Sequence, residues 1–175
     1  MPLHVVLFEP EIPQNTGNII RTCVAAGAKL HLIEPLGFDL HKKNLKRSAT
    51  NHLEYADYAV YSDFEDFEAG NHGQYYYLTR YGNKPHTGID FSSLDENIYL
   101  IFGKESTGIP YDLLKSNLDR CFRIPMTDKA RSLNLSNAVS IVVYEVLRQQ
   151  GYPGLFLHEV QKGENFLASY EGPPV

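Results

Sequence analysis

The sequence predicts an α/β fold built on a mostly parallel β-sheet with helices on both faces. Short apolar segments alternate along the chain with segments that carry helix start and stop signals, which is the pattern of βαβ units. The first apolar segment is a continuous run bounded by prolines, as is typical of a buried parallel strand. Polar, glycine-containing loops lie at the junctions between strands and helices, where open parallel sheets bind their ligands.

Each expected element has a local signal. Strands are assigned to apolar or aromatic runs, and helices to segments that follow a capping side chain; we expect Asn15 to cap the first helix and Gly27 to end it. The expected strands span residues 3–8, 29–33, 59–61, 74–79, 97–102 and 121–124. The expected helices span residues 16–26, 63–68 after the cap Ser62, 110–117 and about 136–150, with a short helix in the basic segment that follows residue 37. Residues 80–87, which include Pro85, are expected to form a loop.

The last helix is the most apolar segment of the chain. It is rich in β-branched residues that favour strands locally, but its length, its polar start and the Gly151–Pro153 stop favour a helix. Its polar residues form one stripe, so the helix must be buried on more than one side. Two interpretations are open: a core helix with a polar cap, or a ligand-facing loop followed by a subunit interface. The stripe contains Asn137, Ser140, Tyr144 and Arg148.

Composition and charge limit the classes of protein. A chain of 175 residues with 43% hydrophobic residues suggests a single domain, here residues 1–155, followed by a tail over 156–175. No apolar run is long enough to span a membrane, and the amino terminus lacks the basic start of a secretory signal. The cysteines, Cys23 and Cys121, are too few for a zinc site, so we expect no metal and a reducing, cytoplasmic environment.

The net charge of −5 argues mildly against bulk electrostatic affinity for nucleic acid, but it does not exclude a local basic patch. Such a cluster is more often a solvated helix face than a binding site. The candidate patch contains His41, Lys42, Lys43, Lys46 and Arg47, with Lys129 and Arg131 further along the chain.

Three polar loops could carry chemistry, and they span residues 13–21, 102–110 and 124–137. The second loop is not a phosphate-binding Walker sequence, because Ile109 follows Gly108 where Lys-Ser or Lys-Thr would be needed. The first strand does not lead into a Gly-x-Gly-x-x-Gly fingerprint either. A nucleotide hydrolase and an ordinary dinucleotide-binding enzyme are therefore disfavoured.

Taken together, the content, order and spacing of these loops resemble the SPOUT class of RNA 2′-O-methyltransferases over almost the whole chain. The segments Glu9–Arg21 and Val142–Glu145 are similar to the minimal tRNA (cytidine/uridine-34)-2′-O-methyltransferases, which act at the wobble nucleotide. The resemblance implies a carboxyl-terminal trefoil knot and S-adenosyl-L-methionine as cofactor. Methylation of another tRNA position or of ribosomal RNA, and a non-catalytic RNA- or cofactor-binding module, are the alternatives.

The resemblance also implies a cofactor pocket made largely of backbone groups from three loops. Plain core packing is the competing interpretation for Leu78, Ile124 and Leu133. Gly103 would let the chain approach a ligand closely, because it has no Cβ. The implied cofactor-binding residues are Leu78, Thr79, Gly103, Ile124, Met126, Ser132 and Leu133.

Arg21 is the central catalytic residue that the resemblance implies. An arginine keeps its proton at neutral pH, so we expect Arg21 to orient the ribose and a phosphate rather than to act as a base. The family places the last helix, about Ser136–Gln150, at a homodimer interface. The other implied catalytic residues are Asn15, Glu105, Ser132 and Asn134, and the candidate contacts to the tRNA anticodon loop are Asn18, Lys46, Arg47, Arg131 and Tyr144.

Overall fold

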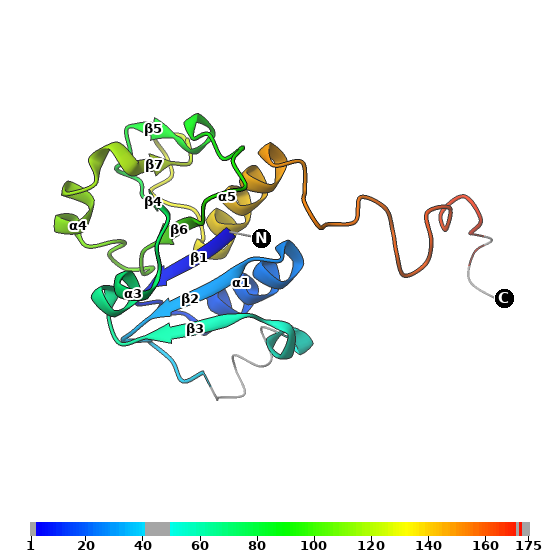
Figure 1. The fold of residues 1–175 in the computed structure, drawn as a ribbon, viewed down its shortest axis with the longest axis horizontal. Coiled ribbons are helices and arrows are strands. Elements are labelled where there is room, and N and C mark those ends of the chain that lie inside the picture. Colours follow the sequence, from blue (N-terminus) through cyan, green and yellow to red (C-terminus); the bar gives the residue numbers. More distant parts are fainter. Residues whose placement is uncertain (1–2, 41–49, 171, 173–175) are drawn as a thin grey trace.

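The computed structural model describes residues 3–40, 50–170 and 172, and its centre is one parallel β-sheet (Figure 1). The sheet has seven strands in the order β3-β2-β1-β6-β4-β7-β5, and every pairing between neighbours is parallel. The predicted mostly parallel sheet is therefore confirmed. The strands are β1 Leu3–Phe8, β2 Lys29–Ile33, β3 Tyr58–Tyr61, β4 Gln74–Leu78, β5 Lys84–Pro85, β6 Ile98–Phe102 and β7 Cys121–Arg123.

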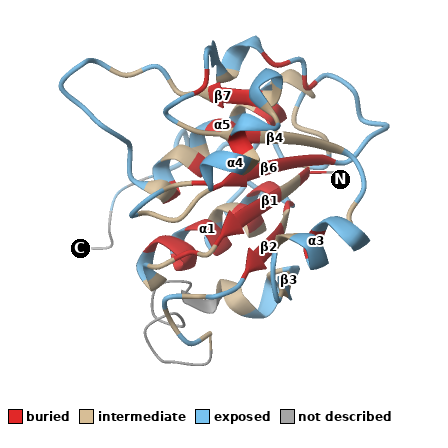
Figure 2. Cartoon of the chain, turned by 90° about the vertical axis from the view of Figure 1, so that its left-hand side faces the viewer, coloured by how far each residue is buried: buried red, intermediate tan, exposed pale blue. Residues whose placement is uncertain are grey.

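Helices cover both faces of this sheet. They are α1 Pro13–Ala26, α3 Phe64–Gly70, α4 Tyr111–Lys115 and α5 Leu135–Gln149, with short 3-10 turns at Thr50–Tyr55, His86–Gly88 and Leu118–Arg120. Successive side chains of a strand point to opposite faces, so β1 contributes to two separate cores. Val5 and Leu7 pack in the same cluster as α1 and α5, whereas Val6 and Phe8 pack with α3 and α4. The strands at the centre are buried, as Figure 2 shows.

Two predicted helix starts were wrong, by three residues for α1 and by one residue for α3. Helix α1 begins at Pro13, with Ile12 as its cap residue, so Asn15 lies inside the first turn and is not the cap. Proline is well suited to a first helical position because it has no N–H to satisfy. Helix α3 is capped by Asp63, whose side chain accepts from the amide of Asp66, rather than by Ser62.

The remaining boundaries agree with the sequence, with one exception. The segment 80–87, predicted as a loop, contains the short strand β5 and the start of a 3-10 turn. The helix predicted in the basic segment, together with Lys46 and Arg47, lies outside the described residues. Tyr77 is buried and its neighbours in β4 pack against the two cores, as expected for that strand.

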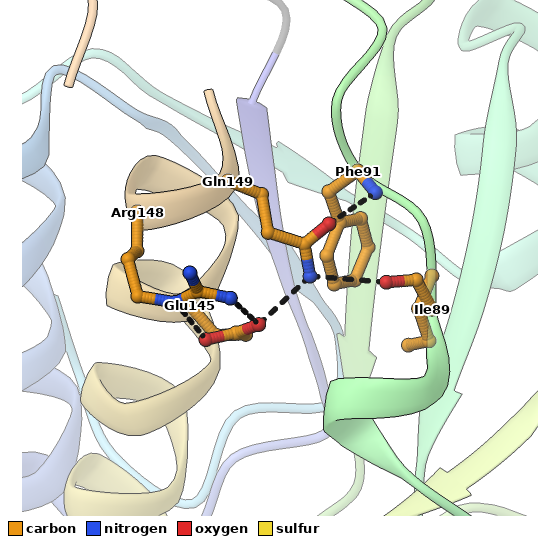
Figure 3. Close-up of polar contacts among 5 residues, drawn as sticks. All are labelled: Ile89, Phe91, Glu145, Arg148 and Gln149. Carbon is orange, nitrogen blue, oxygen red and sulfur yellow. Dashed lines mark hydrogen bonds and ion pairs between the residues drawn. The ribbon is translucent and has the colours of Figure 1, made fainter. Parts of the chain in front are cut away.

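Helix α5 is held by side-chain hydrogen bonds at both ends. At its start, the Asn134 side chain accepts from the amide of Ser136 (3.0 Å). Near its end, Gln149 bridges to the loop before β6: its Oε1 accepts from the Phe91 amide (2.8 Å) and its Nε2 donates to the Ile89 carbonyl (3.0 Å) (Figure 3). These bonds satisfy backbone groups of a loop that has no sheet partner there, so they fix α5 against the sheet.

Within one chain, α5 is not buried on all sides. Val139, Val142 and Val146 are fully buried, but Ile141 and Tyr144 are 41% and 44% exposed. These exposed side chains belong to a stripe that also includes Asn137 and Arg148. The helix itself is confirmed despite its β-branched sequence, because tertiary packing outweighs a weak local propensity.

The segment 156–170 runs away from the body of the molecule (Figure 1) and is mostly exposed. In the described part of the chain, no helix is long and apolar enough to cross a membrane. The trefoil knot stays a prediction.

Two histidines on neighbouring strands, His4 on β1 and His31 on β2, are in contact on the face of the sheet that α3 covers. His31 on β2 has no exposed surface, and its ring nitrogens contact the His4 ring (2.9 Å) and the Tyr61 hydroxyl (3.0 Å). Burial, with smaller contributions from His4 and Lys29, lowers the pKa of His31 to about 3. Burial is also the main cause that lowers the pKa of His4. Both rings are therefore neutral in the folded protein at neutral pH.

We expect the protein to lose stability as the pH falls below the histidine pKa of the unfolded chain, 6.5. The unfolded state then binds a proton at His31 that the folded state excludes until about pH 3, so unfolding becomes easier on acidification. Between pH 7.5 and 5.5 the free energy of unfolding should fall by about 1 kcal/mol from this side chain. Denaturant unfolding should show a smaller fall in His31→Gln and an unchanged fall in the exposed control His72→Gln. Equal pH dependence in all three proteins would contradict the assignment.

Candidate active site

A cavity of about 570 Å³ opens at the carboxyl ends of β4, β6 and β7. Ligands of open parallel sheets bind at this edge. The structure brings together in this one cavity all seven residues that the sequence assigned to a cofactor, namely Leu78, Thr79, Gly103, Ile124, Met126, Ser132 and Leu133. Leu78 and Ile124 also pack on the core, but Leu133 is 38% exposed, so plain core packing does not explain its position.

A chain of hydrogen bonds forms one wall of the cavity. Asn15 is buried, and its side-chain amide donates to Glu105 Oε1 (2.8 Å). Asn134 in turn donates from Nδ2 to Asn15 Oδ1 (2.9 Å), and its own Oδ1 accepts from Ser136. The chain therefore joins α1, the loop after β6 and the start of α5.

Acidic residues before α1 fix the loop after β6. Glu11 accepts from both the amide and the hydroxyl of Ser106, each at 2.8 Å, and these bonds lower the pKa of Glu11. The Glu11 amide donates to Glu105 Oε2 (2.9 Å), and Lys104 forms an ion pair with Glu9. Glu105 is thus oriented by two uncharged donors, the Glu11 amide and Asn15, while the lysine of the same loop is directed to Glu9.

Gly103 is required by the loop itself. A Cβ at this position would lie 2.0 Å from the backbone carbon of Gly108 and 2.1 Å from the nitrogen of Ile109. The loop closes through a hydrogen bond from the Gly108 amide to the Lys104 carbonyl (2.9 Å). The sequence predicted a close approach at Gly103, and the structure shows that the approaching group is the chain's own backbone.

Arg21 does not join Asn15, Glu105, Ser132 and Asn134. It lines a separate groove of about 320 Å³ between α1 and α5, with Asn18 and Tyr144. The reason is helical geometry: Arg21 lies six positions after Asn15, which turns the side chain by about 240° and moves it about 9 Å along the axis. The predicted catalytic group is therefore divided between two sites in a single chain.

The candidate RNA-contacting residues are similarly divided. Asn18 and Tyr144 lie in the groove with Arg21, and Arg131 is exposed in the loop before α5. Tyr144 is 44% exposed, so within one chain it is not a buried core tyrosine. Sequence reasoning did not find Tyr81 and Tyr111, which also line the cavity. They carry no local motif, and their proximity depends on the approach of two distant loops.

The fold and these sites define a parallel α/β protein of the SpoU type. Residues 2–144 match the SpoU rRNA Methylase family, so the chain belongs to that family. The tRNA (cytidine(34)-2′-O)-methyltransferase of Escherichia coli (strain K12) is 44% identical over 159 residues, covering 90% of this chain and 99% of the relative.

Solved structures agree with this membership. One that describes structural insights into the 2-OH methylation of C/U34 on tRNA has a TM-score of 0.78 and 37% identity, covering 85% of this chain and 91% of the other. The SpoU methyltransferase AviRb from Streptomyces viridochromogenes, in complex with the cofactor AdoMet, has a TM-score of 0.72 and 26% identity. That alignment covers 84% of this chain and 57% of AviRb.

We expect Gly103→Ala to lower the free energy of unfolding by about 2 kcal/mol or more, because its Cβ must displace the backbone of residues 108 and 109. Gly70→Ala is the matched control: no atom lies within 4 Å of its Cβ position, so its stability should change by less than about 1 kcal/mol. Denaturant unfolding of both variants measures the difference. A Gly103→Ala protein as stable as the control would show that the loop does not need the close contact.

Proposed function

We propose that this chain transfers a methyl group from S-adenosyl-L-methionine to the ribose 2′-hydroxyl of nucleotide 34, a cytidine or uridine, in the anticodon loop of tRNA. The observation that carries the proposal is the Glu105–Asn15–Asn134 hydrogen-bond chain on the wall of a cavity in a SpoU-family fold. The similarity to relatives described as acting at position 34 supports the choice of nucleotide. A tRNA substrate and two buried, unpaired cysteines support a cytoplasmic location.

The residues of the cavity fit this cofactor. Leu78, Ile124 and Leu133 offer apolar surface to an adenine ring, beside the polar groups of Thr79 and Ser132. The hydrogen-bond partners that orient Glu105 are uncharged, so its carboxylate is suited to a positively charged ligand such as a sulfonium. When bound, the cofactor supplies an activated methyl group.

The chain's own residues supply position and orientation. Hydrogen bonds through Asn15 and Asn134 fix the position of Glu105 relative to the start of α5. The ribose therefore binds against side chains that are already in place. Arg21 can donate hydrogen bonds to the ribose and to a phosphate oxygen in a fork, which orients the 2′-hydroxyl. The proton of that hydroxyl then passes to a nearby acceptor other than arginine, such as the phosphate that Arg21 holds.

We further propose that the active form is a homodimer built through α5. Arg21 lies in a groove apart from the cavity of its own chain, and the exposed stripe of α5 borders that groove with Tyr144. A second copy packed on Ile141 and Tyr144 would cover these side chains and bring one chain's Arg21 toward the other chain's cavity. Residues 156–175 are proposed to be a tail outside the catalytic domain of residues 1–155.

The activity is tested by incubating the purified protein with bulk tRNA and methyl-labelled S-adenosyl-L-methionine, followed by nuclease mapping. Label at the 2′-oxygen of nucleotide 34 is expected. Arg21→Ala should reduce labelling at least about 100-fold while cofactor affinity stays within about two-fold, because the side chain acts on the RNA. Lys162→Ala removes a charge from the exposed tail and serves as the control with full activity. Label at another nucleotide, or only in ribosomal RNA, would overturn the assignment.

The dimer is tested with a heterodimer of Arg21→Ala and Glu105→Gln chains, isolated through two different tags. If sites are shared between chains, one site of each heterodimer contains both intact residues, and activity should return to about half of the wild-type value. If each chain works alone, both sites stay defective and no activity returns. A chain that sediments as a monomer at micromolar concentration would also contradict the dimer.

A further inference from the structure

Two exposed tyrosines, Tyr81 and Tyr111, line the cavity but have no role in the site described above. Tyr81 is 53% exposed and Tyr111 is 65% exposed. Their rings are perpendicular, at 83° with centroids 5.6 Å apart, and their hydroxyl oxygens are 3.1 Å apart in a hydrogen bond. Large aromatic side chains on a surface cost solvation free energy, so a paired group beside a ligand cavity suggests a binding surface.

Both tyrosines are fixed by backbone that cannot move freely. Tyr81 lies in a turn in which the Gly82 amide donates to the Thr79 carbonyl (3.3 Å). Gly82 is packed so closely on β7 that a Cβ would lie 2.4 Å from the Phe122 backbone. Tyr111 is the first residue of α4, next to Pro110 and the buried Ile109. The pair is therefore preorganised, which lowers the entropy cost of binding a ligand.

The charge around the pair suits a polyanion with unpaired bases. The Arg80 guanidinium carbon lies 5.2 Å from the centroid of the Tyr81 ring, and Arg80 is exposed. The phenol of Tyr111 is neutral near pH 7 and does not repel phosphate, and the hydrogen bond with Tyr81 raises its pKa further. One nearby charge is of the opposite sign: Asp112, the residue after Tyr111, is acidic and exposed.

We propose that the Tyr81–Tyr111 pair is a stacking platform for an unpaired RNA base beside the nucleotide that enters the cavity, with Arg80 contacting the adjoining phosphate. Single-stranded RNA is commonly bound by base stacking on aromatic side chains combined with arginine contacts to the backbone. Tyr111 offers the larger exposed surface, while Tyr81 supports it through the shared hydrogen bond. The proposal rests on the proposed function, because it assumes that RNA approaches this cavity.

The cofactor is a less suitable occupant of the pair. Leu78, Ile124 and Met126 line the same cavity but are only partly exposed, whereas Tyr81 and Tyr111 are more exposed than any of these. An exposed arginine beside two aromatic rings matches a base followed by a phosphate, and the cofactor carries no phosphate. A direct measurement of cofactor affinity separates the two occupants.

The test uses the full-length protein and a synthetic anticodon stem-loop that carries 2-aminopurine beside a cytidine at position 34. Stacking on the platform should quench the fluorescence of this base. Tyr111→Ala should raise the RNA dissociation constant by about 5- to 150-fold, the loss measured for one base–aromatic stack. Tyr111→Phe should bind within about three-fold of wild type, since the ring is kept. Tyr58→Ala, at the amino end of the opposite edge strand, is the control and should not change affinity.

The affinity for S-adenosyl-L-methionine, measured by calorimetry, should be the same in Tyr111→Ala and wild type. If Tyr111→Ala instead weakens cofactor binding and leaves RNA binding unchanged, the pair covers the cofactor and the proposal is overturned. Unchanged RNA binding in Tyr111→Ala, with methylation at nucleotide 34 intact, overturns the platform but not the enzyme. Weaker RNA binding in a protein that labels another nucleotide overturns the assigned position and leaves the platform supported. A wild-type protein that binds no RNA overturns both.

Discussion

The hydrogen-bond chain from Glu105 through Asn15 to Asn134 is the interaction on which the site depends. It joins α1, the loop after β6 and the first turn of α5, segments that are 90 and 119 residues from Asn15 in sequence. The buried Asn15 side chain donates from Nδ2 to Glu105 and accepts at Oδ1 from Asn134. Loss of either partner would leave one of these two atoms without a hydrogen bond. Asn134 also caps α5, which means that the same side chain sets the position of the helix and of the cavity wall. Folding and site geometry are therefore coupled at one residue.

The fold was predictable because the signals for its strands and helices lie within short segments of the sequence. Part of the site was not predictable, because it depends on contacts between segments that are far apart in the sequence. Continuous apolar runs gave β1 and β2, and Gly27 and Gly151 mark the ends of α1 and α5 with positive φ angles. The predicted cap at Asn15 was wrong because Pro13 starts the helix, although Asn15 has a side chain of the capping type. The seven cofactor candidates came from resemblance, and the structure gathers them in one cavity. The contact between Tyr81 and Tyr111 could not be predicted, because it requires knowing how two loops 30 residues apart pack.

The separation of Arg21 from Asn15 follows from the helix that carries both. With 3.6 residues per turn, a spacing of six places two side chains on different faces, so no rotation of α1 could direct both into one cavity. Asn18 and Thr22 share the face of Arg21, and Thr22 bonds to Ser140 of α5 at 3.0 Å. Arg21 therefore lines the groove at the seam between the two helices. The proposed second chain at this seam would bring Arg21 toward a cavity without any change within either chain.

An acidic chain that binds RNA must obtain affinity from something other than bulk charge. With a net charge of −5, long-range attraction to the phosphate backbone is weaker than in basic RNA-binding proteins. Stacking on an aromatic ring does not depend on the net charge of the protein, because every base offers an uncharged π-face. Arg80 adds a phosphate contact where the base is already held, and Glu9 keeps Lys104 of the neighbouring loop in an ion pair. Stacking next to the reacting nucleotide also orients the ribose, so the same contact that provides affinity would help to align the 2′-hydroxyl for methyl transfer.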